Sequence, residues 1–214
     1  MGRAGYGGLM GVVREFLQDL RMVSRYADDV KPVARRMFVT NAFDGLLAAL
    51  GVSVGSYSGE VGPAILALGI IGGGLAMGLF SGMIGVYLSE RAERLRELRE
   101  LESKMMKELR GTIYWRMARV IPVYVSLWSG LGVTAAPILV ASPYIAVAAG
   151  LPLPLREAFY LSIAGGLLLA AILGYYLGRV SGENVALSTA RFVGLATGGV
   201  VLVYALRAIV GLPV

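Results

Sequence analysis

Asp44 points more directly to chemistry than any other residue, because it is the only charged side chain between Arg36 and Glu60. It follows Arg36 by eight residues, so an α-helix would carry it about 12 Å into an apolar segment. A carboxylate at that depth is costly, and such residues usually face a cavity and mark the path of an ion or a proton. Asn41, one turn earlier, would add an amide oxygen to the same face. The alternative is an aspartate at the level of the lipid headgroups, paired with Arg35 or Arg36.

Two methionines of the next apolar segment, Met77 and Met83, are weaker candidates for a metal site. A thioether is a soft ligand that suits transition-metal ions and not magnesium or calcium. Most methionines inside membranes only fill space. Both lie beside one of two stripes in which glycine recurs every four residues: Gly74, Gly78 and Gly82, and later Gly174, Gly178 and Gly182. Such stripes let helices approach closely in lipid, and close packing is the main interpretation of both.

Several classes of chemistry are excluded by residue type. Cysteine and histidine are absent, so there is no disulfide framework, no thiol nucleophile and no histidine base. The Asp44-Gly45 pair would suit a phospholipid-forming phosphotransferase, but that chemistry needs several further aspartates, and the next acid is Glu60. Walker and His-Glu metal motifs are also missing. We therefore expect no enzyme activity and no resident cofactor.

The gaps between clusters of charge predict the elements that must position these residues. The chain has 214 residues, 57% of them hydrophobic and 16% charged, with a mean hydropathy of +0.70. A soluble domain is about 25% charged, and lipid admits only segments that satisfy their own backbone hydrogen bonds. We therefore expect an all-α integral membrane protein. Its predicted transmembrane helices cover about 37–57, 63–88, 121–141, 158–178 and 189–210, and the stretch that holds the third is broken by Pro137, Pro143, Pro152 and Pro154.

Lysine and arginine gather at one end of these five predicted helices. Segment 1–36 holds seven, segment 89–120 nine and the turn near 179–191 two, which makes 18 of the 20. Only Arg156 and Arg207 belong to the other end. Basic residues favour the cytoplasmic side, so we expect a multi-pass protein of the cell membrane with a cytoplasmic N-terminus and the C-terminus outside. The positive charge is thereby explained, and nucleic-acid binding is not expected.

The chain is thus expected to have a cytoplasmic segment, 1–36, and a five-helix membrane domain, 37–214, with a cytoplasmic helical loop at 89–120. The first 30 residues carry charges throughout and do not resemble a cleavable signal peptide. Apolar residues recur there at helical spacing: Leu9, Val12, Val13, Phe16, Leu20 and Val23. This pattern predicts an amphipathic helix that lies on the inner membrane surface or packs against the other cytoplasmic helix.

Segment 89–119 is predicted to continue the second membrane helix into the cytoplasm. Its six glutamates could collect metal ions, but they are outnumbered by nine basic residues. Opposite charges also recur at spacings that form ion pairs along a helix. The predicted pairs are Glu90 with Arg94, Glu93 with Arg96, and Glu100 with Lys104. A solvated, salt-bridged face is the preferred interpretation of this segment.

Several motifs together resemble the vacuolar iron transporter family. They are Asp44-Gly45-Leu46 with Gly55 eleven positions after the aspartate, the run Ser81-Gly82-Met83-Ile84-Gly85-Val86-Tyr87-Leu88-Ser89 followed by Arg91-Ala92-Glu93, the segment 137–144, the Ser181-Gly182 turn, and Ser188, Arg191 and Gly194. The likeness runs from about Arg35 to Gly211. It implies a five-helix homodimer that moves Fe²⁺, often Mn²⁺ too, out of the cytosol in exchange for protons.

The resemblance also assigns roles to residues. Asp44 takes the position of the family's first-helix aspartate, which lines the ion path near the dimer axis. A second-helix methionine shares that path in the family; here Gly82 occupies its position, and Met83 follows about 100° around an α-helix. Of the family's cytosolic metal-binding glutamates, Glu93 is matched.

The sequence therefore predicts a proton-coupled exporter of Fe²⁺ or Mn²⁺, with Asp44, Asn41, Met83, Met77 and Glu93 as candidate metal ligands. Its expected partners are a second copy of the chain, membrane lipid and the transported ion. Two alternatives stay open. One is a non-transporting scaffold or subunit of a larger assembly with the same fold. The other is a transporter of another cation or small solute.

Overall fold

The structure of the chain is a computed structural model that describes residues 30–57 and 61–211. These residues form helices and connecting turns, with no strand among them. In chain order the elements are α2 (Val30–Ser56), α3 (Pro63–Ala76), the π-helical segment η1 (Met77–Gly85), α4 (Val86–Met105), α5 (Ile113–Ala148), α6 (Leu155–Ser181) and α7 (Val185–Val210).

Five helices of the described part are long and apolar enough to cross a membrane, because α3, η1 and α4 form one continuous helix. The five predicted spans are confirmed in number and order. The first begins earlier than predicted, at Val30. The apolar pattern between Leu9 and Val23, and with it the predicted amphipathic helix, lies outside the described residues.

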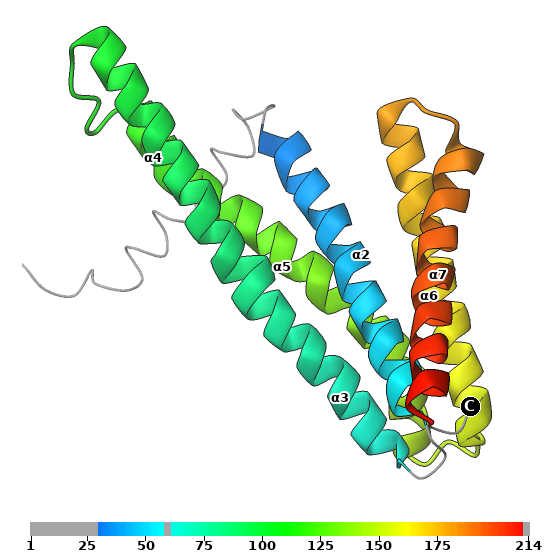
Figure 1. Ribbon diagram of the computed structural model, residues 1–214. Coiled ribbons are helices and arrows are strands. Elements are labelled where there is room, and N and C mark those ends of the chain that lie inside the picture. Colours follow the sequence, from blue (N-terminus) through cyan, green and yellow to red (C-terminus); the bar gives the residue numbers. More distant parts are fainter. Residues whose placement is uncertain (1–29, 58–60, 212–214) are drawn as a thin grey trace, which may run out of the picture.

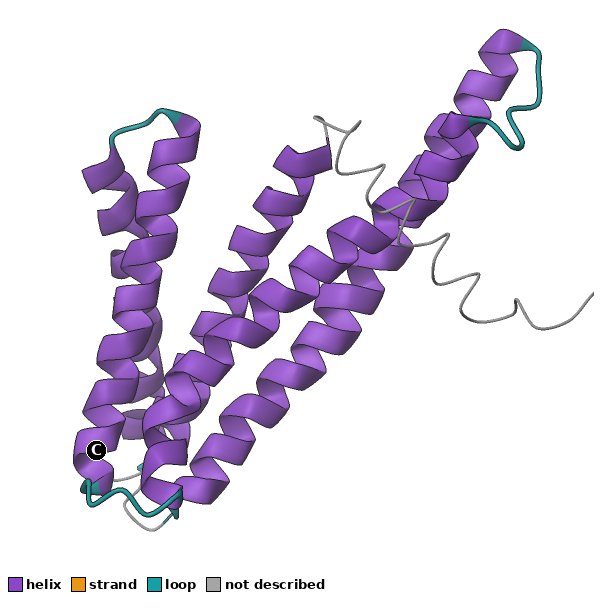
Figure 2. Cartoon of the chain, turned by 180° about the vertical axis from the view of Figure 1, so that it is seen from behind, coloured by secondary structure: helices purple, strands orange, loops and turns teal. Residues whose placement is uncertain are grey.

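The helix α2 occupies the centre of the bundle. It packs most extensively against α5 and also contacts α3, α6 and α7. In Figure 1 it lies in front of α5, with α3 on its left and α7 on its right. Figure 2 shows the same bundle from behind, with the α4–α5 end projecting beyond the other helices. The start of α2, the α4–α5 turn and the α6–α7 turn lie at the same end of the bundle, opposite the end of α7 (Figure 1). The segments that carry most of the lysines and arginines thus lie at one end of the bundle, as the prediction of orientation requires.

The boundaries of the helices follow from local sequence. Pro63 occupies the first turn of α3, where its missing N–H costs nothing. Gly182 ends α6 in the left-handed conformation with φ 69°, which glycine adopts readily. Asn184 then caps α7, because its Oδ1 accepts hydrogen bonds from the backbone N–H groups of Ala186 and Leu187 at 3.0 and 3.3 Å.

The helix α5 runs to Ala148, although the third span was predicted to end near 141, and it contains three prolines. A proline at position 143 removes the N–H that would bond the carbonyl of Leu139. The hydroxyl of Ser142 donates to that carbonyl oxygen at 2.7 Å. Serine side chains can thus replace the lost backbone donor inside a membrane. This compensation explains why the helix continues through Pro143.

The glycine stripes are packing surfaces, as predicted. A Cβ added at Gly74 would lie 2.4 Å from Cγ of Pro137, and one added at Gly78 would lie 2.3 Å from Cγ2 of Thr134. The second stripe meets α7 in the same way, since a Cβ at Gly174 would lie 2.8 Å from Cα of Thr189. Glycine is therefore required for these helices to approach as closely as they do.

Buried polar contacts join α2 to other helices. The hydroxyl groups of Ser53 and Tyr144 lie 2.7 Å apart in the fully buried core, where an unpaired hydroxyl would be costly. At the end of α2, Arg207 is 5% exposed and donates from Nη1 to the carbonyl oxygen of Val54 at 2.6 Å and to that of Tyr57. A cation is favourable there because the carbonyl end of a helix carries partial negative charge.

Candidate functional site

Asp44 lies near the middle of α2, about 18 to 21 Å along the axis from either end of this 27-residue helix. Its side chain is exposed in the single chain. The structure pairs it with neither Arg35 nor Arg36, and Arg36 is about 12 Å away along the axis. The aspartate thus lies well inside the helix, away from both of its ends.

Asp44 belongs to a stripe of small and polar residues along α2, which we call the Asp44 face. It consists of Thr40, Asp44, Ala48, Gly51 and Gly55, which helical spacing places on one side of the helix. Thr40, Asp44 and Gly55 are exposed, and the other two are half-buried. A Cβ added at Gly51 would meet no atom within 4 Å. Within one chain this side of α2 is open around Asp44 and Gly51, whereas a Cβ at Gly55 would lie 3.6 Å from Cγ1 of Val203 on α7.

The neighbouring helices cover α2 on either side of the Asp44 face. Towards α7, a Cβ at Gly199 would lie 3.3 Å from Leu47 Cδ2. Towards α3, a Cβ at Gly69 would lie 3.7 Å from Val52 Cγ1. Helical spacing therefore places Asp44 between the sides of α2 that contact α3 and α7.

The residue after Asp44 fixes the orientation of the helix. A Cβ at Gly45 would lie only 2.4 Å from the carbonyl oxygen of Val133 on α5. A Cβ at Gly132 would likewise lie 2.5 Å from the carbonyl oxygen of Phe38. The two backbones touch at this crossing, so Asp44, one residue before Gly45, is turned away from α5.

Asn41 is half-buried and shares the side of α2 that carries Asp44. Its Nδ2 donates to the carbonyl oxygen of Met37 at 2.8 Å. This bond occupies the amide nitrogen and leaves the amide oxygen as an acceptor. The two candidate oxygen ligands on α2 are thus brought to one side, as the sequence predicted.

Met77 and Met83 both lie in the π-helical segment η1, which sequence reasoning did not predict. Met77 is exposed, and Met83 is half-buried with its Cβ 3.2 Å from where a Cβ at Gly130 would lie on α5. A π-helix bonds each N–H to a carbonyl five residues earlier and often marks a functional site. Each turn then holds more residues than in an α-helix, so the 100° offset expected between Gly82 and Met83 does not apply.

Glu93 is exposed on α4 and bound to a basic neighbour. Its Oε1 lies 2.5 Å from Nη2 of Arg96, and this contact with Arg96 lowers the pKa of the Glu93 carboxyl. The predicted pair of Glu90 with Arg94 is present at 3.8 Å. The prediction for Glu100 was wrong in its partner, because its carboxylate lies 3.6 Å from Arg96.

The continuous helix predicted over 89–119 is also corrected. The helix ends at Met105, Met106 takes the left-handed conformation with φ 49°, and α5 begins at Ile113. Within the turn, Oε1 of Glu102 accepts a hydrogen bond from the backbone N–H of Leu109 at 2.8 Å. The segment is therefore a helical hairpin, which packs together through Leu98, Leu109, Ala118 and their neighbours Leu101 and Trp115.

In the part of the chain that the structure describes, no group of three acidic, histidine or cysteine side chains could hold a metal ion. Asp44 and Glu93 lie on separate elements, one in the centre of the bundle and the other on the projecting hairpin. A single chain thus offers one carboxylate and one amide oxygen on the Asp44 face. Additional ligands for a metal ion at Asp44 would have to come from outside this face of a single chain.

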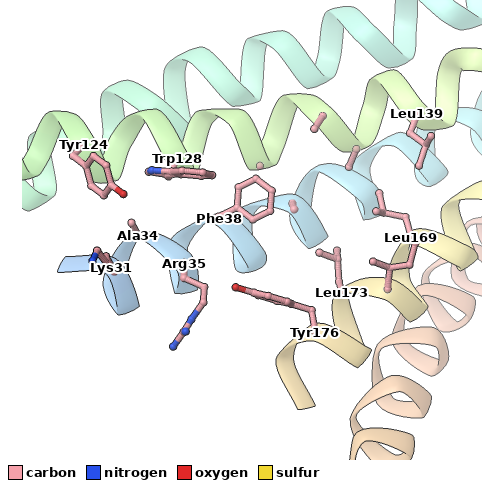
Figure 3. Close-up of a pocket in the computed structure, with 15 residues that line it drawn as sticks. Lys31, Ala34, Arg35, Phe38, Tyr124, Trp128, Leu139, Leu169, Leu173 and Tyr176 are labelled. Carbon is pink, nitrogen blue, oxygen red and sulfur yellow. The ribbon is translucent and has the colours of Figure 1, made fainter. Parts of the chain in front are cut away.

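Sequence reasoning did not find the cavity shown in Figure 3, which has a volume of about 650 Å³ and lies between α2, α5 and α6. None of the predicted metal ligands lines it. Its α2 wall includes Arg35, Phe38 and Ala42, on a different side of the helix from Asp44. Its walls come from three segments far apart in the chain, so no local pattern could have revealed it.

Comparison with known proteins shows what the chain is similar to. The chain is 31% identical over 112 residues to a protein of Methanocaldococcus jannaschii that is described as uncharacterized. The matched part is 51% of this chain and 58% of that protein, so the chain spans little more than half of the relative's length. No protein-family model matches the chain, and no solved structure matches it.

Proposed function

We propose that the chain is a secondary transporter that exports a divalent transition-metal ion, Fe²⁺ or Mn²⁺, in exchange for protons. The observation that carries this proposal is the position of Asp44, which is exposed at the middle of the central helix of a five-helix bundle. The resemblance of the surrounding motifs to vacuolar iron transporters supports the choice of ion.

The first step of the argument is the cost of the carboxylate. An aspartate at the centre of a membrane helix costs about 2.5–3.5 kcal/mol on insertion scales. In this bundle the side chain is not covered by α3, α5, α6 or α7. Because lipid is an unfavourable neighbour for a carboxylate, we expect water or a second copy of the chain to face it, as in an ion or proton path.

The second step is the partner that covers the Asp44 face. Gly51 and Gly55 leave no side chain to hold two helices apart, and small residues favour helix association in lipid. A homodimer with α2 of each copy near the two-fold axis would bring two Asp44 carboxylates and two Asn41 amide oxygens together. Carboxylate and amide oxygens suit Mn²⁺, and the choice of Fe²⁺ comes from the family resemblance.

Proton coupling follows from the same residue. A carboxylate must be deprotonated to bind a metal ion, so protonation releases the ion and deprotonation restores the site. In the described spans Asp44 is the carboxylate placed for this work. The basic ends of the helices favour the cytoplasm, and the outward direction of transport is what the family resemblance implies for a chain in the cell membrane.

A second candidate function is a non-transporting scaffold or subunit of a larger assembly. The ion pairs of Glu93 and its neighbours favour it, since carboxylates held by arginine bind metal poorly. Transport of another cation or a small solute along the Asp44 face is a variant of the first proposal.

Ion uptake into liposomes that contain the purified chain separates these functions. The transporter predicts uptake of Fe²⁺ and Mn²⁺ above that of empty liposomes, with little uptake of Mg²⁺. A scaffold predicts no uptake of any ion. Uptake of a monovalent cation or a solute in preference to Fe²⁺ would assign the path a different cargo.

A further inference from the structure

The cavity between α2, α5 and α6 is large enough for a ligand, since small-molecule pockets range over about 300–1,000 Å³ and this one measures about 650 Å³. It belongs to neither the Asp44 face nor the hairpin of α4 and α5. Its walls fall into two groups, a basic and aromatic end and an aliphatic end (Figure 3).

The cavity is elongated in the direction of the helices. On α5 its wall runs from Tyr124 to Leu139, fifteen positions that span about 22 Å. One leaflet contributes about 15 Å of hydrocarbon, so the cavity matches a leaflet plus its headgroup level. At its deep end Leu139, Leu169 and Leu173 line the wall.

The other end of the cavity has the chemistry of a membrane interface. Lys31 and Arg35 lie there with the aromatic rings of Tyr124 and Trp128. The hydroxyl of Tyr176 points towards the part of α2 that carries Arg35 (Figure 3). Aromatic side chains commonly lie at the headgroup level, with basic side chains beyond them.

The charge of this end is complementary to an anion. The guanidinium of Arg35 lines this end of the cavity, and no carboxylate does so among the described residues. Arg35 is exposed, and a guanidinium can bind two oxygens of one phosphate group. A free phosphate ion would use this end but would leave the aliphatic end without a partner. An amphiphile with a phosphate head fills both.

We propose that this cavity binds an anionic membrane phospholipid, with the phosphate at Arg35 and one apolar chain between α2, α5 and α6. The lipid would hold apart the basic ends of α2 and α6 while they converge at their other ends (Figure 1). The site does not depend on ion transport, and it would be present in a scaffold as well.

The chain offers a direct optical test, because it has only two tryptophans and Trp128 lines the cavity. The full-length Trp115→Phe variant in phosphatidylcholine nanodiscs leaves Trp128 as the reporter. Small amounts of phosphatidylglycerol or phosphatidylcholine with brominated chains are then added, and quenching of Trp128 is measured. We expect phosphatidylglycerol to quench at about fivefold lower concentration, the ratio that corresponds to ~1 kcal/mol for one basic residue at an anionic surface.

Three variants in this background locate the site. Arg35→Gln should make the two lipids quench Trp128 at about equal concentrations. Arg36 is an exposed neighbour outside the cavity, so Arg36→Gln should keep the preference for phosphatidylglycerol. Ala135→Phe should weaken quenching by the anionic lipid by filling the cavity. Equal quenching by the two lipids in the parent protein would overturn the proposal. So would equal losses in Arg35→Gln and Arg36→Gln, an unchanged preference in Ala135→Phe, or displacement of the lipid by millimolar inorganic phosphate.

Discussion

The carbonyl oxygen of Val133 lies against the α-carbon of Gly45, so closely that a Cβ at Gly45 would come within 2.4 Å of it. Pro137 lacks the N–H that would bond this carbonyl within α5. The oxygen that loses its usual helical donor and the missing side chain of Gly45 thus meet at the crossing of α2 and α5. This contact sets the rotation of α2 and, with it, the direction of Asp44.

Replacing Gly45 by alanine should destabilise the bundle. The new methyl group cannot fit against the backbone of α5, and overpacking of this kind costs about 1–3 kcal/mol. Thermal unfolding of the purified protein in detergent measures the effect. Gly72→Ala is the matched control, because a Cβ there meets nothing within 4 Å. Equal stability of the two variants would show that the crossing is looser than described.

The hydroxyl of Ser142 should matter only while Pro143 is present. Ser142→Ala should cost about 1 kcal/mol, because the carbonyl of Leu139 then loses its donor. In a Pro143→Ala background the backbone N–H supplies that donor, and the same substitution should cost close to nothing. A double-mutant cycle on unfolding in detergent measures this coupling. Additive effects would mean that the side chain does not compensate for the proline.

Much of the fold could be predicted from the sequence because the charge clusters mark the ends of the helices. The lengths were less predictable. The extension of α5 to Ala148 depends on the bond between Ser142 and Leu139, and nothing in the spacing of residues 77–85 indicated a π-helix.

The candidate site was predictable only in part. Asp44 and Asn41 could be placed on one side of a helix from their spacing alone. The open face around Asp44 could not, since it depends on where α3 and α7 pack. The cavity at Arg35 depends on contacts between three helices that are distant in the chain.

Two copies of the chain should meet at the Asp44 face. The natural sequence has no cysteine, so Gly51→Cys introduces one reactive thiol on each copy. Oxidation in membranes should cross-link this variant to a dimer. Gly165→Cys on α6, where a Cβ also meets nothing within 4 Å, should remain monomeric. Cross-linking at Gly165 but not at Gly51 would assign the interface to another side of the bundle.

The glutamates of α4 should contribute little to metal transport. Glu93 and Glu100 are paired with Arg96 and Glu97 with Arg94, so each has a basic competitor for its oxygens. The combined Glu93→Ala, Glu97→Ala and Glu100→Ala variant should change uptake of Fe²⁺ or Mn²⁺ less than Asp44→Asn alone. Complete loss of transport in the triple variant would identify these glutamates as ligands.

The hairpin should also respond to acid in a defined direction. Because the contact with Arg96 lowers the pKa of Glu93 below its ordinary 4.5, this ion pair within α4 stabilises that helix at higher pH. Its contribution is fully present above pH 4.5 and is lost as the pH falls through the lowered value. Helicity of the hairpin, followed by site-specific labels in the full chain, should stay constant from pH 8 to pH 5. A change near pH 6 would contradict the assignment of this pair.

The most direct test of the account is metal-driven proton movement in liposomes, with Asp44→Asn beside the wild type. The amide keeps the size of the side chain but can neither take up a proton nor carry charge. We expect wild-type protein to move protons when Fe²⁺ or Mn²⁺ is added, and Asp44→Asn to fall to the level of empty liposomes while remaining folded. Glu157→Gln, the same change at an exposed helix end on α6, should behave like the wild type. Exchange by Asp44→Asn at the wild-type rate would show that the carboxylate at the centre of α2 is not part of the path.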